Sequence, residues 1–461
     1  MEKEINKYSY AILGAGRSGI GIAKLLKKIG ADVFLSESQV IDKLKYFDEK
    51  ALKDYKIPFE TGGHTEKIYN YDVIIKSPGI PVNSNIIIKA NELNKKVVSE
   101  IEIAFLLCKA PVIAITGTNG KTTTTVLTGE IFKNAGIDTK VCGNVGLAFS
   151  EIVDDVTEKS IVVLETSSFQ LESTEEFKPK VSMLLNFTPD HVDWHGSLEN
   201  YFNAKLKINR NQSDDDAIIF NYDDEIIRGF SSKFKGNIIP FSVKENLAEK
   251  DFHLGCYVVD NQIIYFNKIK NENSNIINTD EIFIRGNHNL QNSLAAVAAA
   301  KYLNVKDDVV KKTLINFKGV EHRIEPVREL KGVKYYNDSK ATNFDSTYVA
   351  LESFKKNIVL IMGGKKGASN FDLIKDFVEE RVKYIIAIGQ TRNDIKEYFS
   401  KFKEVIIEET LESAVNKAYN LSESGDIVLF SPAYKSFDMF DNFEHRGEEF
   451  KKFVNNLIPD K

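Results

Sequence analysis

Short apolar runs alternate with helical patterns along most of the chain. In the first hundred residues, apolar runs at residues 10–13, 32–35 and 72–75 predict strands, and a helical pattern at residues 20–29 lies between the first two. Short buried strands separated by helices are typical of a parallel sheet with helices on both faces. This part of the chain is therefore predicted to be a doubly wound α/β unit.

The same alternation returns twice further along the chain. A second unit has predicted strands at residues 112–116, 161–164 and 181–185, with helices at residues 121–135 and 293–303. A third unit has predicted strands at residues 333–336, 358–361, 384–387 and 427–430. The pattern predicts an α/β fold of three domains, at residues 1–99, 100–319 and 320–461. The Asn-rich residues 271–278 are interpreted as a surface loop or hairpin.

Composition narrows the class of protein. The 461 residues are 43% hydrophobic and 28% charged, with a net charge of −5, as in ordinary globular proteins and without the basic excess of a nucleic-acid-binding domain. Three widely spaced cysteines argue against a disulfide framework. The N-terminus lacks the apolar core of a signal peptide, and no apolar run is long enough to span a membrane. We expect a cytoplasmic protein, and a monomer.

The most specific motif is a glycine-rich loop between a predicted strand and a predicted helix. Its residues are Gly117, Thr118, Asn119, Gly120, Lys121, Thr122 and Thr123. Glycines let backbone N–H groups converge on a phosphate, and the helix N-terminus attracts negative charge. Lys121 would reach the β- and γ-phosphates, and the Thr122 hydroxyl would bind Mg²⁺. The loop is shorter than the common phosphate-loop pattern, and a structural turn with a chance lysine is the alternative.

A second glycine motif lies at the end of the first predicted strand. Gly14, Gly16 and Gly19 have the spacing of a dinucleotide-binding turn, and Glu37 follows at the end of the next strand. Taken alone, this motif indicates an NAD(P)-dependent oxidoreductase or a purely structural turn. It favours phosphate binding without specifying which phosphate.

Polar residues gather after the strands of the second unit. Glu165 ends one strand, His191 is predicted to end the next, and Lys205 lies on a predicted helix. Each alone is explained by capping, solvation or a polar core position. Because ligands gather at the carboxyl ends of strands in open α/β sheets, the three residues could converge on one metal–phosphate site.

Further polar motifs follow in the third unit and just before it. They are residues 286–292 with Asn289 and Asn292, His322–Arg323, residues 337–343, and residues 431–447. Together with the phosphate loop, residues 165–170, Asp190–His191 and Ala204–Lys205, these motifs resemble, in order, the Mur ligase family of peptidoglycan synthesis. The resemblance covers nearly the whole chain. Residues 14–19, 77–81 and 431–447 resemble the branch that adds D-glutamate to UDP-N-acetylmuramoyl-L-alanine.

The resemblance implies a role for each matching residue. It implies an N-terminal Rossmann-like domain for the uridine nucleotide, a central phosphate-loop ATPase domain and a C-terminal Rossmann-like domain for the amino acid. ATP would contact the phosphate loop, Asn289, Asn292, Arg323 and Asp338. The UDP-linked substrate would contact Gly14, Arg17, Ser18, Glu37, Ser77, Gly79, Asn144 and His191. D-Glutamate would contact Thr342, Ser436, Phe437 and Phe443. Thr122, Glu165, His191 and a carbamylated Lys205 would bind two Mg²⁺ ions, or Mn²⁺, and Lys121, Glu165, His191, Lys205 and Lys340 would act in catalysis.

The implied reaction is ATP-dependent amide formation through an acyl phosphate. Two departures from the family pattern concern the glutamate site: Gln39 stands where some members have an arginine, and Lys365 and Lys366 shift the position of a lysine. The alternatives are another amide ligase of this fold, such as a folylpolyglutamate synthase or a ligase for a different amino acid, a non-catalytic nucleotide switch, and the oxidoreductase. Glu165, His191 and Lys205 together argue against a switch, which needs no second metal site.

Overall fold

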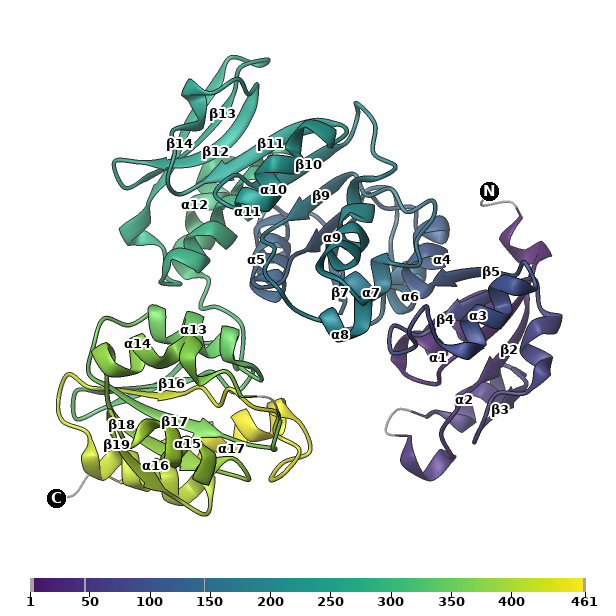
Figure 1. The fold of residues 1–461 in the computed structure, drawn as a ribbon. Helices are drawn as coiled ribbons and strands as arrows, with labels where there is room; N and C mark the ends of the chain where they lie inside the picture. The colour runs from purple at the N-terminus through teal and green to yellow at the C-terminus, as the bar shows by residue number, and fades with distance from the viewer. Residues whose placement is uncertain (1–3, 45–46, 145, 368, 459–461) are drawn as a thin grey trace. The chain divides into compact units, whose positions relative to one another are not determined.

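The computed structural model describes residues 4–44, 47–144, 146–367 and 369–458. The outermost residues of the predicted first and third domains, 1–3 and 459–461, lie outside this part of the chain. The chain divides into two compact units. One comprises the chain up to Ile282 together with Gln291–Ile315, and the other comprises Phe283–Leu290 together with the chain from Asn316 onward. In the described residues, the named strands form three sheets, which lie within the three predicted domains (Figure 1).

The first sheet has five parallel strands in the order β3-β2-β1-β4-β5. The strands are β1 (Ser9–Leu13), β2 (Asp32–Ser36), β3 (Phe59–Glu60), β4 (Val73–Lys76) and β5 (Lys96–Ser99). The helices are α1 (Arg17–Lys28), α2 (Glu49–Asp54), α3 (Asn85–Glu92) and α4 (Glu100–Leu107). The strand order reverses between β1 and β4, which is where ligands bind in sheets of this kind. The predicted doubly wound unit is confirmed.

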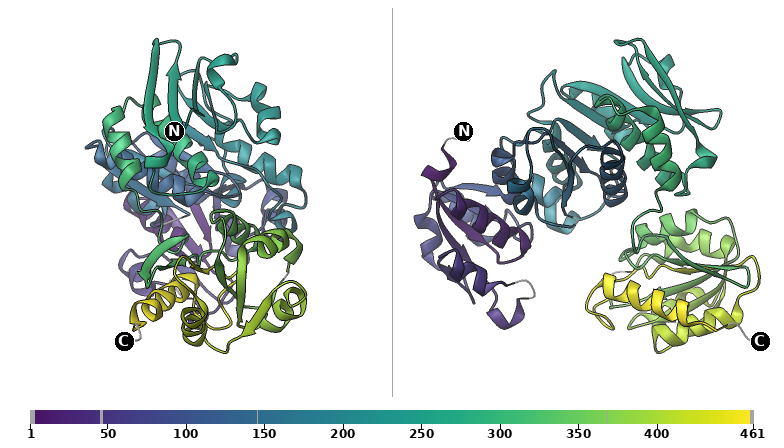
Figure 2. Two further views of the ribbon diagram at one scale, coloured as in Figure 1. Left: turned by 90° about the vertical axis from the view of Figure 1, so that its left-hand side faces the viewer. Right: turned by 180° about the vertical axis from the view of Figure 1, so that it is seen from behind.

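The second sheet has nine strands, in the order β14-β13-β12-β11-β10-β9-β6-β8-β7. Its parallel strands are β6 (Val112–Thr116), β7 (Thr139–Gly143), β8 (Ile161–Glu165), β9 (Val181–Leu184), β10 (Ala217–Asn221), β11 (Asn237–Ser242) and β12 (Leu254–Val259). Two further strands, β13 (Gln262–Asn267) and β14 (Glu272–Asn278), run antiparallel to their neighbours. Of the two interpretations of residues 271–278, the hairpin is confirmed, because β14 pairs with β13 at the end of the sheet farthest from β7 (Figure 2).

Eight helices accompany this sheet in the described residues. They are α5 (Lys121–Asn134), α6 (Phe149–Ile152), α7 (Ser168–Leu171), α8 (Val192–His195), α9 (Leu198–Leu206), α10 (Glu225–Phe230), α11 (Asn287–Tyr302) and α12 (Asp307–Asn316). The helix predicted at residues 293–303 begins earlier, inside the motif that was expected to precede it, because Asn289 and Leu290 N–H groups already bond to the Gly286 carbonyl.

The third sheet has six strands in the order β15-β16-β20-β17-β18-β19. The strands are β15 (Glu325–Leu330), β16 (Val333–Asn337), β17 (Ile358–Gly363), β18 (Val382–Ile388), β19 (Glu404–Ile407) and β20 (Ile427–Phe430). The helices are α13 (Phe344–Glu352), α14 (Phe371–Arg381), α15 (Arg392–Phe399), α16 (Leu411–Leu421) and α17 (Phe443–Asn456). All pairs are parallel except β15 with β16.

Alternation within single strands explains why the third sheet is covered on both faces. Leu360 and Met362 of β17 pack with α13, α14 and α15, whereas Val359 and Ile361 pack with α16 and α17. Successive side chains on a strand point to opposite faces, so a continuous apolar run needs helices on both sides.

The described helices include none long and apolar enough to cross a membrane.

Candidate nucleotide and metal site

The phosphate loop connects β6 to α5, as predicted. Gly120 precedes the first helical residue with φ of +80°, a left-handed conformation that favours glycine. The ammonium of Lys121 donates to the carbonyls of Gly117 (2.9 Å) and Thr118 (2.8 Å). The loop therefore curls around its own lysine, which holds the cation at the helix N-terminus.

Asn186, which the sequence analysis did not select, braces this loop from the end of β9. The Asn119 N–H donates to Asn186 Oδ1 (2.8 Å), and Asn186 Nδ2 donates back to the Asn119 carbonyl (3.0 Å). The Thr118 N–H donates to the Asn186 carbonyl (3.1 Å). A side-chain amide can satisfy a backbone N–H and C=O at once, so Asn186 holds the loop at Asn119 by two hydrogen bonds.

Asn292 lies against the phosphate loop. It is buried, its Oδ1 accepts from Thr124 Oγ1 (3.2 Å), and a Cβ added at Gly120 would lie 2.3 Å from the same oxygen. Asn289 is in the first turn of α11, where its Nδ2 donates to the Arg285 carbonyl (2.8 Å). The expected contact of these two residues with adenine stays a prediction.

Glu165 ends β8 and is buried beside the loop that carries Asn144. Asn144 Nδ2 donates to Glu165 Oε1 (2.9 Å), and the Asn144 N–H donates to the Glu165 carbonyl (3.0 Å). Glu165 Oε2 is buried without a hydrogen-bond partner among the described residues. A carboxylate oxygen in that position suits a hard cation such as Mg²⁺.

Lys205 is on α9, and its side-chain nitrogen contacts the phosphate loop. Its Nζ donates to the Gly117 carbonyl (2.8 Å), the oxygen that Lys121 also contacts, and lies 4.5 Å from the centre of the Tyr201 ring. Burial, with a smaller contribution from Lys121, lowers the pKa of Lys205 well below its usual value. A neutral lysine is a nucleophile, and the carbamylation of Lys205 that the resemblance implies stays a prediction.

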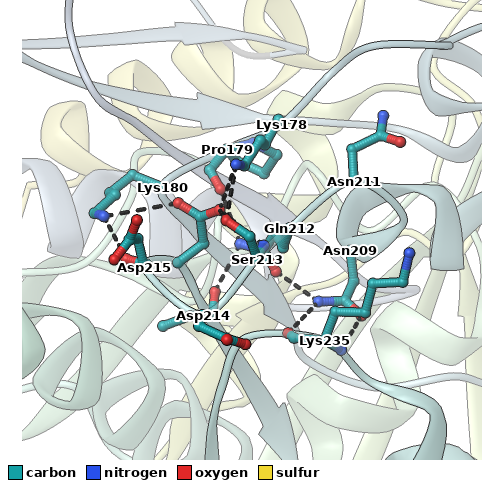
Figure 3. Close-up of polar contacts among 12 residues, drawn as sticks. Lys178, Pro179, Lys180, Asn209, Asn211, Gln212, Ser213, Asp214, Asp215 and Lys235 are labelled. Carbon is teal, nitrogen blue, oxygen red and sulfur yellow. Dashed lines mark hydrogen bonds and ion pairs between the residues drawn. The ribbon is translucent and has the colours of Figure 1, made fainter.

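The segment after α9 is anchored by a polar network near the starts of β9 and β10, whereas the phosphate loop follows the end of β6 (Figure 3). Gln212 Nε2 donates to the Pro179 carbonyl (2.8 Å), and Gln212 Oε1 accepts from Ser182 Oγ (2.8 Å) and Asn209 Nδ2 (2.6 Å). Because Asn209 and Gln212 follow α9 directly, these bonds fix the end of the helix that carries Lys205.

The prediction that His191 ends a strand is wrong. Strand β9 ends at Leu184, and His191 lies just before α8 with φ of 51°. Its side chain is 47% exposed, lies 3.3 Å from the Asp190 carboxylate and packs against the ring of Phe169. The residues between the strand and His191 are not part of a strand, and Pro189 among them cannot donate a ladder hydrogen bond.

The predicted metal ligands belong to separate elements: Thr122 to α5, Glu165 to β8, His191 to the segment before α8 and Lys205 to α9. In the described part of the chain, no three His, Cys, Asp or Glu side chains surround one point. The set of four ligands for two metal ions therefore stays a prediction.

The first glycine turn lies at the switch point of the first sheet. Gly14 has φ of +104°, and a Cβ added there would lie 2.8 Å from Ser77 Cβ, so the turns after β1 and β4 touch. The Glu37 carboxylate accepts from the N–H groups of Ala15 (2.7 Å) and Gln39 (2.9 Å). Burial would raise the pKa of Glu37, but these hydrogen bonds outweigh it and lower the pKa.

Three further residues predicted for the UDP-linked substrate, Arg17, Ser18 and Gly79, lie in the segments that follow β1 and β4. Arg17 begins α1 and donates to the Gly146 carbonyl (3.1 Å), and Ser18 is its neighbour in the first helical turn. Gly79 is exposed in the turn that follows Ser77. Gly14, Arg17, Ser77 and Gly79 thus share one end of the sheet, and their contact with the UDP-linked substrate stays a prediction.

In the second compact unit, the motif at residues 337–343 follows β16 and is buried at its start. Asp338 is 3% exposed, and its carboxylate accepts from Ser431 Oγ (2.7 Å) and the Ile324 N–H (3.2 Å). Burial raises the pKa of Asp338 to about 7, although the charge of Arg323 opposes the shift. Arg323 and Asp338 are therefore brought together, and the ribose contact expected of Asp338 stays a prediction.

Arg446 lies within the motif at residues 431–447 and ties it to the motif at residues 337–343. It is 1% exposed on α17. Its guanidinium donates to Ser339 Oγ (3.0 Å), the Ser339 carbonyl (2.7 Å) and the Tyr434 carbonyl (3.0 Å). Five fixed N–H donors let one arginine join the turns after β16 and β20 to α17.

The residues predicted for D-glutamate differ in exposure. Ser436 is buried, Thr342 and Phe443 are half-buried, and Phe437 is 59% exposed. Lys340 Nζ lies 5.7 Å from the centre of the Phe443 ring. Lys365 and Lys366 are exposed, with Lys366 Nζ 3.3 Å from Asp394, and Gln39 is exposed in the other compact unit.

A phosphate loop on a central sheet, with two further doubly wound sheets in the chain, defines the class of the Mur ligases. Three family models match: the MurD N-terminal domain at residues 10–86, the Mur ligase middle domain at residues 115–300, and the Mur ligase glutamate ligase domain at residues 322–434. The solved MurC ligase of Thermotoga maritima shares the fold, with a TM-score of 0.58 at 20% identity over 97% of this chain and 99% of that one.

Curated relatives define the branch within that class. A UDP-N-acetylmuramoylalanine--D-glutamate ligase of Caldanaerobacter subterraneus is 40% identical over 98% of this chain and 99% of its own length. The protein of that name from Clostridioides difficile is 41% identical over 97% of this chain and 98% of its own length. The chain therefore belongs to the Mur ligase family, in its UDP-N-acetylmuramoylalanine--D-glutamate ligase branch, and is an enzyme.

Proposed function

We propose that this enzyme joins D-glutamate to UDP-N-acetylmuramoyl-L-alanine, with conversion of ATP to ADP and phosphate. The observation that carries the chemistry is the pair of lysines, Lys121 and Lys205, on the Gly117 carbonyl. Lys121 is suited to bind phosphate as a cation. Lys205 is buried, and burial favours its neutral amine form. The substrates follow from the named relatives, which match this chain over nearly its full length.

Amide formation from a carboxylate requires activation of that carboxylate. The γ-phosphoryl group would pass from ATP to an oxygen of the alanyl carboxylate, giving an acyl phosphate and ADP. The amine of D-glutamate would then attack the acyl carbon, with loss of its proton and departure of phosphate. Lys121 would stabilise negative charge on the phosphates, and removal of such a group typically lowers the rate by about 100- to 1000-fold.

The donor set fits Mg²⁺, because Glu165 Oε2 is a buried carboxylate oxygen without a partner among the described residues. Thr122 and Glu165 would hold one ion, and His191 and a carbamate on Lys205 would hold a second. Bound Mg²⁺ would offset the repulsion between the phosphates and the carboxylate. The carbamate would form when the Lys205 amine bonds to the carbon of CO₂ and releases a proton, which replaces a positive group by an oxygen ligand.

In each of the three sheets, the predicted ligand contacts follow the carboxyl ends of the strands. Gly14, Arg17, Ser77 and Gly79 would hold the uridine nucleotide, while Asn144 and His191 would contact the muramyl part. Lys340, Thr342 and Ser436 would lie near ATP or the incoming amino acid. Lys365 or Lys366 would supply the cation for a glutamate carboxylate.

The test is phosphate release from ATP with UDP-N-acetylmuramoyl-L-alanine and a panel of amino acids. We expect turnover with D-glutamate and none with L-glutamate, lysine or diaminopimelate. Turnover with another amino acid, or with folate substrates, would overturn the proposal in favour of a different amide ligase. Oxygen-18 in the substrate carboxylate should appear in the released phosphate, and unlabelled phosphate would exclude the acyl-phosphate step.

A further inference from the structure

A cavity of ≈ 300 Å³ in the first compact unit is lined by the ends of α9 and α10 and by the residues that follow each helix. Its volume is at the lower limit of small-molecule sites, roughly 300–1,000 Å³. Asn209, which is buried, joins the two segments: its Nδ2 donates to the Lys235 carbonyl (2.9 Å) and its Oδ1 accepts from the Lys235 N–H (3.0 Å) (Figure 3). In the described part of the chain, none of the residues predicted to bind ATP, the UDP-linked substrate, D-glutamate or a metal lines this cavity. The proposed reaction therefore leaves it without a role.

The lining is rich in positive charge. Its cations are Lys207, Arg210, Lys233 and Lys235, and its described residues include no Asp or Glu. Lys207 and Arg210 donate to backbone carbonyls within residues 172–175, and Lys235 Nζ donates to the Arg210 carbonyl (2.8 Å). These acceptors are neutral. Among the described residues, none of the four cations forms an ion pair with a carboxylate, so their charges are not cancelled.

The surroundings offset only part of this charge. A helix C-terminus carries roughly half a negative charge, so the ends of α9 and α10 balance about one of the four positive charges. Two carboxylates of the segment that accepts from Lys207 and Arg210 have other partners: Glu175 lies 2.8 Å from Lys96, and Glu172 lies 3.3 Å from His195. The cavity therefore favours an anion.

Apolar side chains form the other part of the lining. They are Leu206, Phe230 and Phe234, all half-buried. The ring centres of Phe230 and Phe234 are 6.0 Å apart, and their planes are inclined by 56°. Lys233 Nζ lies 4.6 Å from the centre of the Phe230 ring, which brings a cation to the aromatic wall. A flat apolar ring with an anionic group attached to it matches both parts of the lining.

We propose that this cavity binds a small phosphate ester whose organic part is an aromatic ring. A phosphate monoester carries a charge of about −1.5 to −2 at pH 7 and three acceptor oxygens, which is more than a carboxylate offers. Its oxygens would accept from Arg210, Lys233 and Lys235, and its ring would pack on Phe230 and Phe234. Arg210 uses only Nη2 for the carbonyls, and the planar fork of its guanidinium matches phosphate oxygens.

Calorimetric titration of the full-length protein with phenyl phosphate tests the proposal, at about pH 7.5 and thus above the second phosphate pKa of about 6. Inorganic phosphate has the anion without the ring, phenol has the ring without the phosphate, and benzoate has the ring with a weaker anion. We expect saturable binding of phenyl phosphate, binding at least about tenfold weaker for the other three, and weaker binding of phenyl phosphate at high salt. Failure of phenyl phosphate to bind, equal binding of any of the other three, or an affinity that does not change with salt would overturn the proposal.

Variants locate the bound probe. Replacing Lys233 and Lys235 together by alanine should weaken phenyl phosphate binding about tenfold. The matched control replaces Lys159 and Lys244, two exposed lysines elsewhere in the same unit, and should leave binding unchanged. Lys121→Ala, which removes the cation of the phosphate loop, should also leave it unchanged. Unchanged binding in the Lys233 and Lys235 double variant, or loss of binding in Lys121→Ala, would place the anion elsewhere and overturn the proposal.

Lys233 and Lys235 are both exposed, so the double variant is expected to fold. If it does not, Lys233→Ala alone should weaken binding about threefold, and unchanged binding in that variant would count against the cavity. The titration uses neither ATP nor D-glutamate, so its outcome is independent of the amino-acid panel that tests the proposed reaction.

Discussion

The side-chain nitrogen of Lys205 lies 2.8 Å from the carbonyl oxygen of Gly117, so a helix residue and the phosphate loop share a hydrogen bond across 88 positions of sequence. Lys121 donates to the same oxygen at 2.9 Å. Two ammonium groups on one carbonyl repel each other, and Lys205 is the more buried of the two. The proton is therefore most easily lost from Lys205.

Carbamylation of Lys205 is the first prediction. With ¹³C-bicarbonate, the protein should give a carbamate carbon signal by NMR that disappears in Lys205→Arg, because arginine does not provide a neutral amine. Lys205→Arg should also lower the rate of phosphate release by about 100- to 1000-fold. Lys133→Arg, a change on the surface of α5, is the control. A signal that persists in Lys205→Arg, or a fully active variant, would show that Lys205 has no such role.

A second prediction separates backbone strain from a local clash in the phosphate loop. Gly120 and Gly136 have nearly the same left-handed φ, +80° and +78°. A Cβ at Gly120 would lie 2.3 Å from Asn292 Oδ1, whereas a Cβ at Gly136 would meet nothing within 4 Å. Each alanine should lower the free energy of unfolding by about 1–2 kcal/mol through strain. Only Gly120→Ala should also displace Asn292 and raise KM for ATP.

Chemical denaturation and phosphate-release kinetics measure the two effects. Gly136→Ala serves as the matched control, since it introduces the strained residue without the clash. Identical ATP kinetics in both variants would mean that the contact between Gly120 and Asn292 does not support nucleotide binding.

The part of the site that could be predicted from sequence is the part built from neighbouring residues. The phosphate loop and Glu165 follow directly from strand ends, since an apolar run fixes where each strand stops and which residues come next. Asn186 and Arg446 were not found in the same way. Their contacts with Asn119 and Ser339 cross 67 and 107 positions, and nothing in the local pattern distinguishes them from other polar residues.

The fold was predicted to the same extent and for the same reason. The buried parallel strands have continuous apolar runs, whereas β14 (Glu272–Asn278) is mostly polar and gains its place by pairing with β13. His191 was misplaced because β9 ends at Leu184, and the residues between that strand and α8 do not extend it. Periodicity thus located the core strands, while edges and turns depend on partners that lie elsewhere in the chain.

A third prediction concerns the contact of α17 with His322. A Cβ at Gly447 would lie 2.2 Å from His322 Nδ1, and that nitrogen is 2.9 Å from Asn337 Nδ2. Gly447→Ala should lower the free energy of unfolding by about 1–3 kcal/mol, as overpacking of a filled site does. It should also lower phosphate release, because Asn337 leads into the turn that carries Asp338 and Lys340.

Gly229 on α10 is the control for Gly447. It is also helical, but a Cβ there would meet nothing within 4 Å. Gly229→Ala should therefore raise stability by about 0.5–1 kcal/mol, since alanine reduces the freedom of the unfolded chain. Thermal and chemical unfolding measure the change in the free energy of unfolding for each variant. If both alanines change it in the same direction, steric contact with His322 does not determine the effect.

The fourth prediction is a pH dependence of stability that originates at Glu100, the first residue of α4. Glu100 is 4% exposed, and its carboxylate accepts from the Ser150 N–H at 2.6 Å. Burial raises the pKa of Glu100 from 4.5 to about 7, and the neighbouring Glu151 adds to the shift, while the hydrogen bonds from Ser150 oppose it. The folded protein therefore keeps a proton on Glu100 at pH values where the unfolded chain has lost it.

The sign follows from this difference in bound protons. Between pH 4.5 and 7 the folded state binds more protons at Glu100 than the unfolded state, so the free energy of unfolding falls as pH rises and levels off above pH 7. Glu100→Gln keeps an oxygen acceptor for the Ser150 N–H but has no charge to bury. At pH 8 this variant should be more stable than the parent by about 1–3 kcal/mol, and its stability should change less between pH 5 and pH 8. Glu158→Gln removes a charge from the exposed surface and should leave the parent's profile in place. Urea unfolding across that pH range makes the comparison, and parallel profiles for Glu100→Gln and the parent would mean that Glu100 is ionised at no cost in the folded protein.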